Sequence, residues 1–253
     1  MQENSALGRA MDLVRDLRAR CPWDRAQTRE TLRPYLVEEA LELDHALGDG
    51  SADAIRNELA DVLLNVAFQL VLAEESGHFT ADDVAITLER KIQRRHPQLF
   101  DLGPKESWEV IKRREREGEA GLLDGLPPTL PPLLLAYRLQ ERAAAVGFDW
   151  PDTKGPAEKI REELAECEAE LSSPGGAQND PRLNEELGDL LFSVVNLARK
   201  AGVAPGVALD GANRKFRLRF DALERLAATR GIDVHTAGLD VLDTLWDETK
   251  QEG

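Results

Sequence analysis

The sequence has few of the residues that build disulfide frameworks, zinc sites or membrane spans. Two cysteines, Cys21 and Cys167, stand far apart among 253 residues, without a CxxC spacing or a nearby pair of histidines. We interpret them as free thiols of a reducing compartment, which disfavours a disulfide scaffold or a zinc site. Apolar runs are too short to cross a bilayer, and charged residues interrupt residues 1–20. We therefore expect no membrane partner and a cytoplasmic location.

Positive charge is also scarce. The chain has 32 Lys and Arg residues against 47 Asp and Glu residues, which gives a net charge of −15, and no basic stripe is visible. A nucleic-acid binder normally carries such a stripe to offset phosphate charge, so we expect no nucleic-acid partner. The acidity suits a protein that concentrates divalent cations, although acidic proteins are common.

Alternating β-branched runs are missing, and helical periodicity dominates instead, so we predict an all-α fold. Glycine and proline gather at residues 118–132, which is the best candidate for a domain boundary. We therefore predict two tandem helical-bundle modules, at residues 1–120 and 121–253. The long segments that lack proline, and that we predict to be helical, are 35–47, 51–76, 157–171, 182–201 and 209–228.

An internal repeat is the most informative feature of the sequence. Three polar patterns occur twice in the same order, and the extra residues of the second copy fall in the loop at 172–181, where an insertion costs little. We interpret the repeat as a duplicated module. The patterns are Glu-Glu-x-x-Glu at 38–42 and 162–166, Glu-x-x-Asp at 58–61 and 186–189, and Lys-x-x-x-Arg at 91–95 and 215–219.

Helical geometry separates these acidic patterns from an ordinary solvated helix face. At about 100° per residue, the polar residues of 58–72 and of 182–199 converge on one narrow stripe of an otherwise apolar helix. A helix that is apolar nearly all round is expected to be buried, with its polar stripe facing a cleft. The stripes contain Glu58, Asp61, Asn65 and Gln69 in the first copy, and Arg182, Glu186, Asp189, Ser193 and Asn196 in the second.

Buried carboxylates that cluster in this way need a cation, and an all-oxygen set suits Mg²⁺, or Mn²⁺, better than zinc. The partner helices supply further carboxylates, because residues three apart on a helix are neighbours. The predicted metal ligands are Glu163, Glu166, Glu186 and Asp189 in the second copy, and Glu39, Glu42, Glu58 and Asp61 as a second set.

Basic residues placed around an acidic site predict a ligand with more negative charge than the metal can absorb, such as a polyphosphate. Lysine and arginine on helices usually form surface ion pairs, but the repetition of two of them favours a ligand. These residues are Lys159, Arg182, Lys215 and Arg219, with Lys91 and Arg95 as the repeated pair.

At these motifs the chain resembles the MazG nucleoside triphosphate pyrophosphohydrolases of the all-α NTP pyrophosphatase superfamily. Tandem acidic modules joined by a proline-rich link are shared by few families, and the resemblance covers nearly the whole length. It is carried by CPWDRAQT (21–28), EEALELDHAL (38–47), ELADVLLN (58–65), KIQRRHPQLF (91–100), RLQERAAAVGFDW (138–150), EELGDLLFSVVNLAR (185–199) and NRKFRLRF (213–220).

The resemblance implies hydrolysis of nucleoside triphosphates between the α- and β-phosphates, and a homodimer that completes its sites. It also implies that the C-terminal module is the main catalytic one, with Glu162 or Glu163 orienting the attacking water; the sequence does not rank the two. One departure is Leu218, where the family often has a second arginine, so one phosphate contact is in doubt. The implied nucleotide contacts are Lys159, Arg182, Lys215, Arg219 and Trp246, of which Lys215 and Arg219 also offset charge during the reaction.

Two other functions remain open at this point. A carboxylate-bridged di-iron bundle is suggested by Glu42-x-x-His45, but the second copy has Ala169 at the histidine position and the chain holds only four histidines. The other alternative is a non-catalytic helical scaffold, above all for the N-terminal module. Trp246 is also open, since a tryptophan near a chain end more often packs than stacks on a base.

Overall fold

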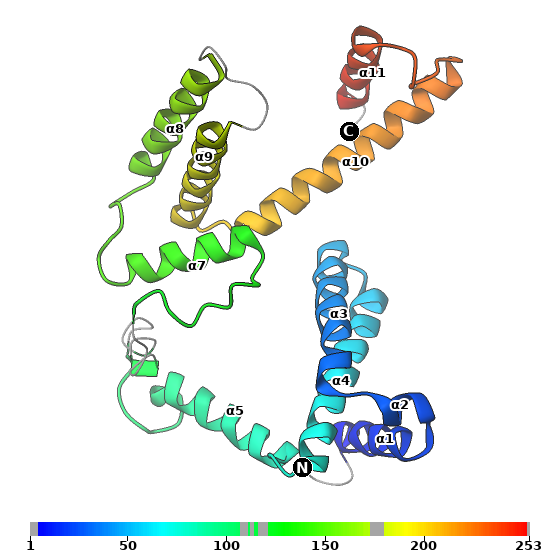
Figure 1. Cartoon of the computed structure of the whole chain (residues 1–253), viewed down its shortest axis with the longest axis vertical. Helices are drawn as coiled ribbons and strands as arrows, with labels where there is room; N and C mark the ends of the chain where they lie inside the picture. Colours follow the sequence, from blue (N-terminus) through cyan, green and yellow to red (C-terminus); the bar gives the residue numbers. More distant parts are fainter. Residues whose placement is uncertain (1–4, 107–110, 112–113, 116–120, 173–179, 252–253) are drawn as a thin grey trace. The chain divides into compact units, whose positions relative to one another are not determined.

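The computed structural model describes residues 5–106, 111, 114–115, 121–172 and 180–251, and these form helices, turns and loops without a strand (Figure 1). The all-α prediction is confirmed. The chain divides into two compact units, Met1–Arg114 and Glu115–Gly253. This division lies a few residues before the boundary predicted at residue 120. The loop predicted at 172–181 lies largely outside the described residues.

The first unit is built on a hairpin of two long helices, α3 and α4. Gly50 adopts a left-handed φ of 72° where the chain turns between them, and Ser51 caps α4 by accepting a hydrogen bond from the backbone of Ala54. The shorter helices α1 and α2 lie at one end of the hairpin (Figure 1). The elements are α1 (Ala6–Arg20), α2 (Pro22–Ala26), α3 (Arg29–Asp49), α4 (Ala52–Glu75), α5 (Ala81–Arg95) and the 3₁₀ turn η1 (Pro97–Leu99).

Helix α3 begins earlier than the sequence predicts. The predicted start, Tyr35, follows Pro34, yet the helix runs through this proline from Arg29. A capping box explains the early start, because Thr28 and Thr31 each accept a hydrogen bond from the other's backbone amide, at 3.3 and 2.8 Å. These bonds stabilise the first turn, which offsets part of the cost of a proline inside the helix.

The core of the first unit joins α1, α3 and α4. Arg18 reinforces it, since its side chain is only 11% exposed, pairs with Glu75 at 2.5 Å and donates to the carbonyl of Gln27 at 3.0 Å. Arg18 thereby ties α1 to α4 and to the segment that leads into α3. The buried apolar residues are Met11, Val14, Leu32, Ala67, Phe68, Val71 and Leu72.

The second unit contains another hairpin, α8 with α9. Asp180 caps α9 by accepting from the backbone of Arg182, and Pro181 fits the first helical position. Gln140 joins α7 to α9 by donating to the carbonyl of Phe192 at 2.8 Å. Helix α11 packs on α10 through Leu223, Ala227 and Leu245. The helices are α7 (Pro132–Ala144), α8 (Lys154–Ser172), α9 (Pro181–Lys200), α10 (Pro205–Thr229) and α11 (Leu239–Gln251).

A buried charge cluster fixes the segment between α7 and α8. Asp149 pairs with Arg199 at 2.5 Å and with Lys200 at 2.8 Å, and all three side chains are at most 20% exposed. The hydrogen bond from Arg199 lowers the pKa of Asp149 to about 2, although partial burial acts in the opposite direction. The cluster anchors the end of α9 to the chain that leads into α8.

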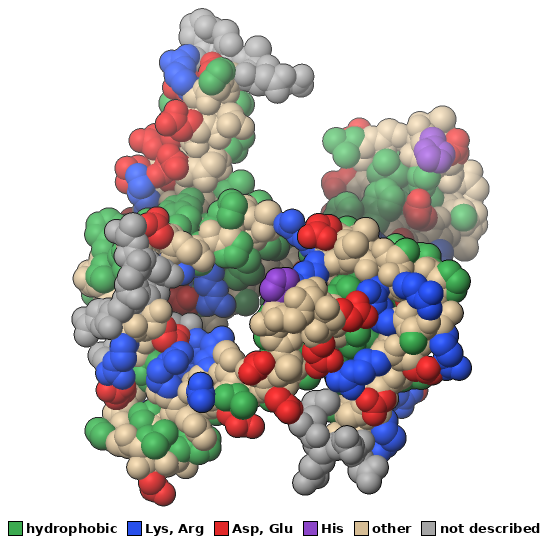
Figure 2. Space-filling view, turned by 60° about the horizontal axis from the view of Figure 1, so that its bottom comes forward, with side chains coloured by type: hydrophobic (Ala, Val, Ile, Leu, Met, Phe, Trp, Pro, Cys, Tyr) green, Lys and Arg blue, Asp and Glu red, His purple; other side chains and the backbone are tan. Residues whose placement is uncertain are grey.

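The expectation that α4 and α9 are covered on every apolar side is wrong for the single chain. Leu63 of α4 is 38% exposed and Leu191 of α9 is 59% exposed, because no described helix covers these sides. The surface accordingly shows many apolar side chains (Figure 2). The exposed apolar residues of the two helices are Leu59, Leu63, Leu64, Val66, Leu187, Leu191, Phe192 and Val194.

Among the described helices, none combines the length and the apolar character needed to cross a membrane. Cys21 and Cys167 are both free thiols, and Cys167 is buried on α8. Burial and the neighbouring charge of Glu186 raise the pKa of the Cys167 thiol, which keeps it protonated near neutral pH.

Candidate metal centres

Three carboxylates meet between α8 and α9 of the second unit. Glu163 and Glu166 come from α8 and Glu186 comes from α9, and one oxygen of each lies within 4.8 Å of the others. Glu163 is buried, Glu186 is half-buried and Glu166 is exposed, so the group opens to solvent on one side. The residues of this group are three of the four ligands predicted for the second copy. The fourth, Asp189, is exposed and lies outside the group.

Lys159 is the cation of this group. Its ammonium nitrogen lies 2.5 Å from an oxygen of Glu163 and 2.8 Å from an oxygen of Glu162, one turn further along α8. These hydrogen bonds raise the pKa of Lys159. The Glu163 side chain is only 4% exposed whereas that of Glu162 is 58% exposed. Glu163 therefore points into the group and Glu162 lies on its solvent side.

The negative charge of the group is not fully offset by Lys159. Desolvation raises the pKa of Glu166, and the hydrogen bond and negative charge of Glu163 raise it further, while Lys159 lowers it. A hydrogen bond between two carboxyl groups requires a proton on one of them. The raised pKa of Glu166 reflects negative charge that Lys159 does not fully offset, and an oxygen-rich group with such charge suits a divalent cation.

Arg182 lies at the start of α9 and faces α8. Its Nε is 3.5 Å from Oε2 of Glu170, an oxygen that is buried and accepts no hydrogen bond among the described residues. Sequence reasoning missed Glu170, which lies one turn beyond Glu166. The spacing of four residues could have indicated Glu170. The first copy has Ala46 at the matching position, however, so a comparison of the two copies did not single out Glu170.

The remaining predicted contacts of the second unit lie on α10 and α11. Lys215 is exposed and Arg219 is half-buried, and within the described residues no contact joins either of them to the three carboxylates. Trp246 packs beside the α10–α11 core, with its ring 5.3 Å from that of Phe216. Trp246 therefore packs against its own unit, as the sequence left open, and a contact between Trp246 and a nucleobase stays a prediction.

The first unit holds a matching group between α3 and α4. Oxygens of Glu39, Glu58 and Asp61 lie within 4.8 Å of one another. The fourth predicted ligand, Glu42, is exposed and outside the group. Partial burial raises the pKa of Glu39, and the charges of Asp61, Glu42 and Glu58 raise it further. Asn65 is buried and donates to the backbone carbonyl of Asp61 at 3.2 Å, which helps to fix that turn of α4.

Both groups fit a hard divalent cation. Each offers three carboxylates from two facing helices, and oxygen is the ligand that Mg²⁺ and Mn²⁺ prefer. His45, the histidine of the di-iron alternative, is exposed and belongs to neither group. The two groups differ in which helix supplies most of the carboxylates. In the second unit two come from α8 and one from α9, whereas in the first unit one comes from α3 and two from α4.

Comparison with protein families finds a match in the first unit. Residues 27–100 match the model of the MazG nucleotide pyrophosphohydrolase domain. The matched segment contains the carboxylate group of α3 and α4 together with Lys91 and Arg95.

Three curated relatives cover nearly the whole chain. The nucleoside triphosphate pyrophosphohydrolase/pyrophosphatase MazG of Thermotoga maritima is 43% identical over 235 residues, which is 91% of this chain and 89% of that protein. The nucleoside triphosphate pyrophosphohydrolase of Escherichia coli K12 is 38% identical over 252 residues, 96% of this chain and 95% of that protein. An uncharacterized protein, YabN of Bacillus subtilis, is 40% identical over 249 residues, 94% of this chain and 50% of its own length. The chain therefore belongs to the MazG family of nucleoside triphosphate pyrophosphohydrolases.

Proposed function

We propose that this chain hydrolyses nucleoside triphosphates between the α- and β-phosphates, with Mg²⁺ or Mn²⁺ as cofactor. The products are a nucleoside monophosphate and pyrophosphate. The observation that carries the proposal is the group of three carboxylates on α8 and α9 with the ammonium group of Lys159 beside it. Carboxylates that hold a divalent cation, next to a positively charged side chain, suit a substrate with a polyphosphate tail.

In this proposal Glu163, Glu166 and Glu186 would hold the metal ion, and Asp189, three residues after Glu186 on α9, would be the fourth ligand. When bound, such an ion polarises a phosphoryl oxygen and offsets the charge of the leaving pyrophosphate. Glu162 is assigned to the attacking water, because it lies on the solvent side of Glu163 and one turn from Lys159. A carboxylate in that place orients the water and accepts its proton.

The cations of the second unit bind the triphosphate. Lys159 is held by Glu162 and Glu163, and with a metal ion on Glu163 its ammonium group would be free to contact a phosphate oxygen. Arg182 stands at the entrance beside Glu170. Lys215 and Arg219 of α10 lie away from the carboxylates of their own chain, so we assign them to the site of a second copy.

A homodimer follows from that assignment, and the exposed apolar residues of α4 and α9 support it. Leu191, 59% exposed, and Leu63, 38% exposed, lie on helices whose polar stripe already faces the neighbouring helix. Apolar surface of this extent on a helix is typical of a protein interface. The substitution Leu191→Glu should convert the dimer into a monomer in sedimentation experiments. A monomeric wild-type protein would contradict the proposal.

The reaction is tested by product analysis. Purified protein is incubated with a panel of nucleoside triphosphates and Mg²⁺ in ¹⁸O-labelled water. We expect monophosphate and pyrophosphate in equal amounts, with the label in one product only, as cleavage of a single α–β linkage demands. Release of orthophosphate and diphosphate would place the cleavage at the outer linkage instead. If no nucleotide of the panel is hydrolysed, the proposal that this site is catalytic is wrong.

A further inference from the structure

A tryptophan lies on the first turn of α8, the helix that supplies Lys159 and Glu163 to the carboxylate group of the second unit. Gly155 is the second residue of α8, and a Cβ atom at this position would overlap Cδ1 and Nε1 of the Trp150 indole. The indole therefore occupies the place where a side chain of residue 155 would lie. Trp150 is nevertheless 40% exposed, so part of its ring surface is open to a ligand.

The chain around Trp150 restricts where the indole can go. The residue before it, Asp149, pairs with Arg199 at 2.5 Å and with Lys200 at 2.8 Å, which anchors the segment to the end of α9. The residue after it is Pro151, and a proline limits the backbone conformation of the residue that precedes it. An aromatic ring that is held in this way loses little conformational freedom when a ligand binds to it.

The indole, Lys159 and Glu163 follow one another along one side of α8. Residues four apart on a helix are neighbours, so the direction of a side chain at residue 155, which the indole takes, leads to Lys159 and then to Glu163. Each step of four residues advances about 6 Å along the helix. The ammonium nitrogen of Lys159 lies 2.5 Å from an oxygen of Glu163. An aromatic surface, a cation and the carboxylates thus stand in the order in which a nucleotide carries its base and its phosphates.

We propose that Trp150 stacks on the base of the nucleoside triphosphate. This placement depends on the proposed function, in which the triphosphate contacts Lys159 and the carboxylates of α8 and α9 hold the metal ion. Every base has a flat π-face, so an indole binds different bases without reading their edges. Trp150 therefore strengthens the binding of purine and pyrimidine nucleotides alike.

Within one chain, Trp150 is better placed for this contact than Trp246. The ring of Trp246 lies 5.3 Å from that of Phe216, beside the α10–α11 core. Trp150 instead lies on the helix of the carboxylate group, and Gly155 beneath it is one turn before Lys159. Replacing each tryptophan separately distinguishes the two positions of the base.

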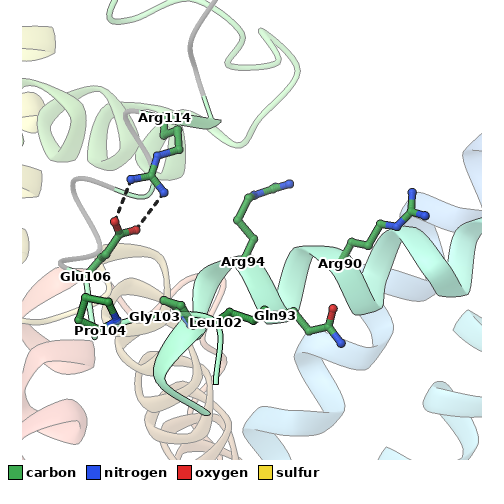
Figure 3. Close-up of a pocket in the computed structure, with 9 residues that line it drawn as sticks. Arg90, Gln93, Arg94, Leu102, Gly103, Pro104, Glu106 and Arg114 are labelled. Carbon is green, nitrogen blue, oxygen red and sulfur yellow. Dashed lines mark hydrogen bonds and ion pairs between the residues drawn. The ribbon is translucent and has the colours of Figure 1, made fainter. Parts of the chain in front are cut away.

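A separate pocket of about 370 Å³ lies in the first unit, at the end of α5 (Figure 3). Arg90 lines it from α5, and Arg114 donates two hydrogen bonds to Glu106 at 2.8 and 3.0 Å (Figure 3). Arginine side chains bind phosphates well, so a binding experiment needs a variant of this pocket as a control. Arg90→Ala is that variant, and it leaves the second unit unchanged.

The test is calorimetric titration of the full chain, with Mg²⁺, using three ligands. Two are the α,β-methylene analogues of ATP and CTP, which resist cleavage at that linkage, and the third is tripolyphosphate, which has no base. We expect Trp150→Leu to weaken the binding of both analogues by about tenfold, as the loss of one base–aromatic stack predicts, and to change the tripolyphosphate affinity by less than about twofold. Trp150→Phe keeps a ring and should keep most of the affinity. Arg90→Ala, and Trp23→Leu at an exposed tryptophan of the first unit, should leave all three affinities unchanged.

A second variant disturbs the contact without removing the indole. Gly155→Ala places a methyl group where the indole lies, so it should displace the ring and cause the same selective loss of nucleotide affinity. The matched control is Gly206→Ala, at the second residue of α10, where a Cβ atom meets no described atom within 4 Å.

The stacking contact is overturned if Trp150→Leu leaves the nucleotide affinity unchanged, or if it weakens tripolyphosphate by the same factor. A loss confined to Trp246→Leu would place the base against Trp246 instead. These outcomes leave the proposed function standing. If the wild-type chain binds neither the analogues nor tripolyphosphate, or if Arg90→Ala abolishes the binding of all three, the stacking contact and the proposed function fail together.

Discussion

The two carboxylate groups offer similar sets of oxygen ligands, but they differ in the positively charged side chains beside them. In the second unit, Lys159 lies three residues before the Glu-Glu-x-x-Glu motif and bonds to two of its glutamates. In the first unit the matching residue is Tyr35, whose ring instead lies 6.4 Å from that of Trp23, edge to face. The position of Arg182 is likewise taken by Ala54. The first group therefore has the carboxylates of a candidate metal site without these two cations.

This difference bears on what each group can do. Three carboxylates are sufficient to attract a divalent cation, but a triphosphate brings further negative charge that the metal alone does not offset. We infer that the first group binds a cation without turning over a nucleotide, and that the second group serves the reaction. The family resemblance points the same way, but the inference from Tyr35 and Ala54 stands on the residues of this chain.

The largest effect should follow removal of the metal. With EDTA, we expect pyrophosphate release to fall by more than about 10³-fold, because the charge on the transferred phosphoryl group is then offset by side chains alone. Added Mg²⁺ should restore the activity of the wild type and of Glu39→Gln at the same metal concentration. A displaced activation curve for Glu39→Gln would show that the first group contributes to the reaction.

A smaller effect should follow the removal of Lys159, the cation that is present in the second group and missing from the first. The substitution Lys159→Met keeps much of the side-chain volume and should lower kcat/KM by about 10–100-fold, as expected for one charge-assisted contact with phosphate. Tyr35→Phe, at the matching place in the first unit, should change kcat/KM by less than about twofold. Equal effects of the two substitutions, measured by initial rates, would remove the distinction between the groups.

The smallest effect concerns the charged anchors of the two units. Asp149→Asn should lower the free energy of unfolding by about 1–2 kcal/mol, since it breaks a mostly buried pair with Arg199. The corresponding anchor of the first unit is Arg18 with Glu75, and Glu75→Gln is the matched variant. Glu75 is 46% exposed, so solvent screens this pair more and its loss should cost less. Denaturant titrations measure the free energies of unfolding of the two variants.

The Asp149 anchor also predicts a pH dependence. Its pKa in the folded chain, about 2, lies below the value of about 3.9 for an unfolded chain. The pair therefore stabilises the fold fully above about pH 4, and this contribution is lost as the pH falls towards 2. The stability difference between wild type and Asp149→Asn should shrink over that interval. A difference that stays constant from pH 5 to about 2 would contradict the low pKa.

The sequence predicted the helices and most of the carboxylates because both follow from local spacing. Glu58 and Asp61 fall on one stripe by helical geometry alone, and the structure brings them together with Glu39. The sequence missed the early start of α3, since a capping pair overrides Pro34, and it missed Glu170, which the first copy does not repeat. The exposure of Leu191 was also unforeseen, because periodicity indicates an apolar side and does not say which chain covers it.

The central claim is that the carboxylates of α8 and α9 form the catalytic site and that those of α3 and α4 do not. The most direct measurement compares the initial rate of pyrophosphate release for Glu163→Gln and Glu39→Gln with Mg²⁺ in excess. Each substitution replaces one carboxylate by an amide of nearly the same size. We expect Glu163→Gln to lose more than about 10³-fold in rate and Glu39→Gln to keep at least about half. Full activity in Glu163→Gln, or loss of activity in Glu39→Gln alone, would contradict the account.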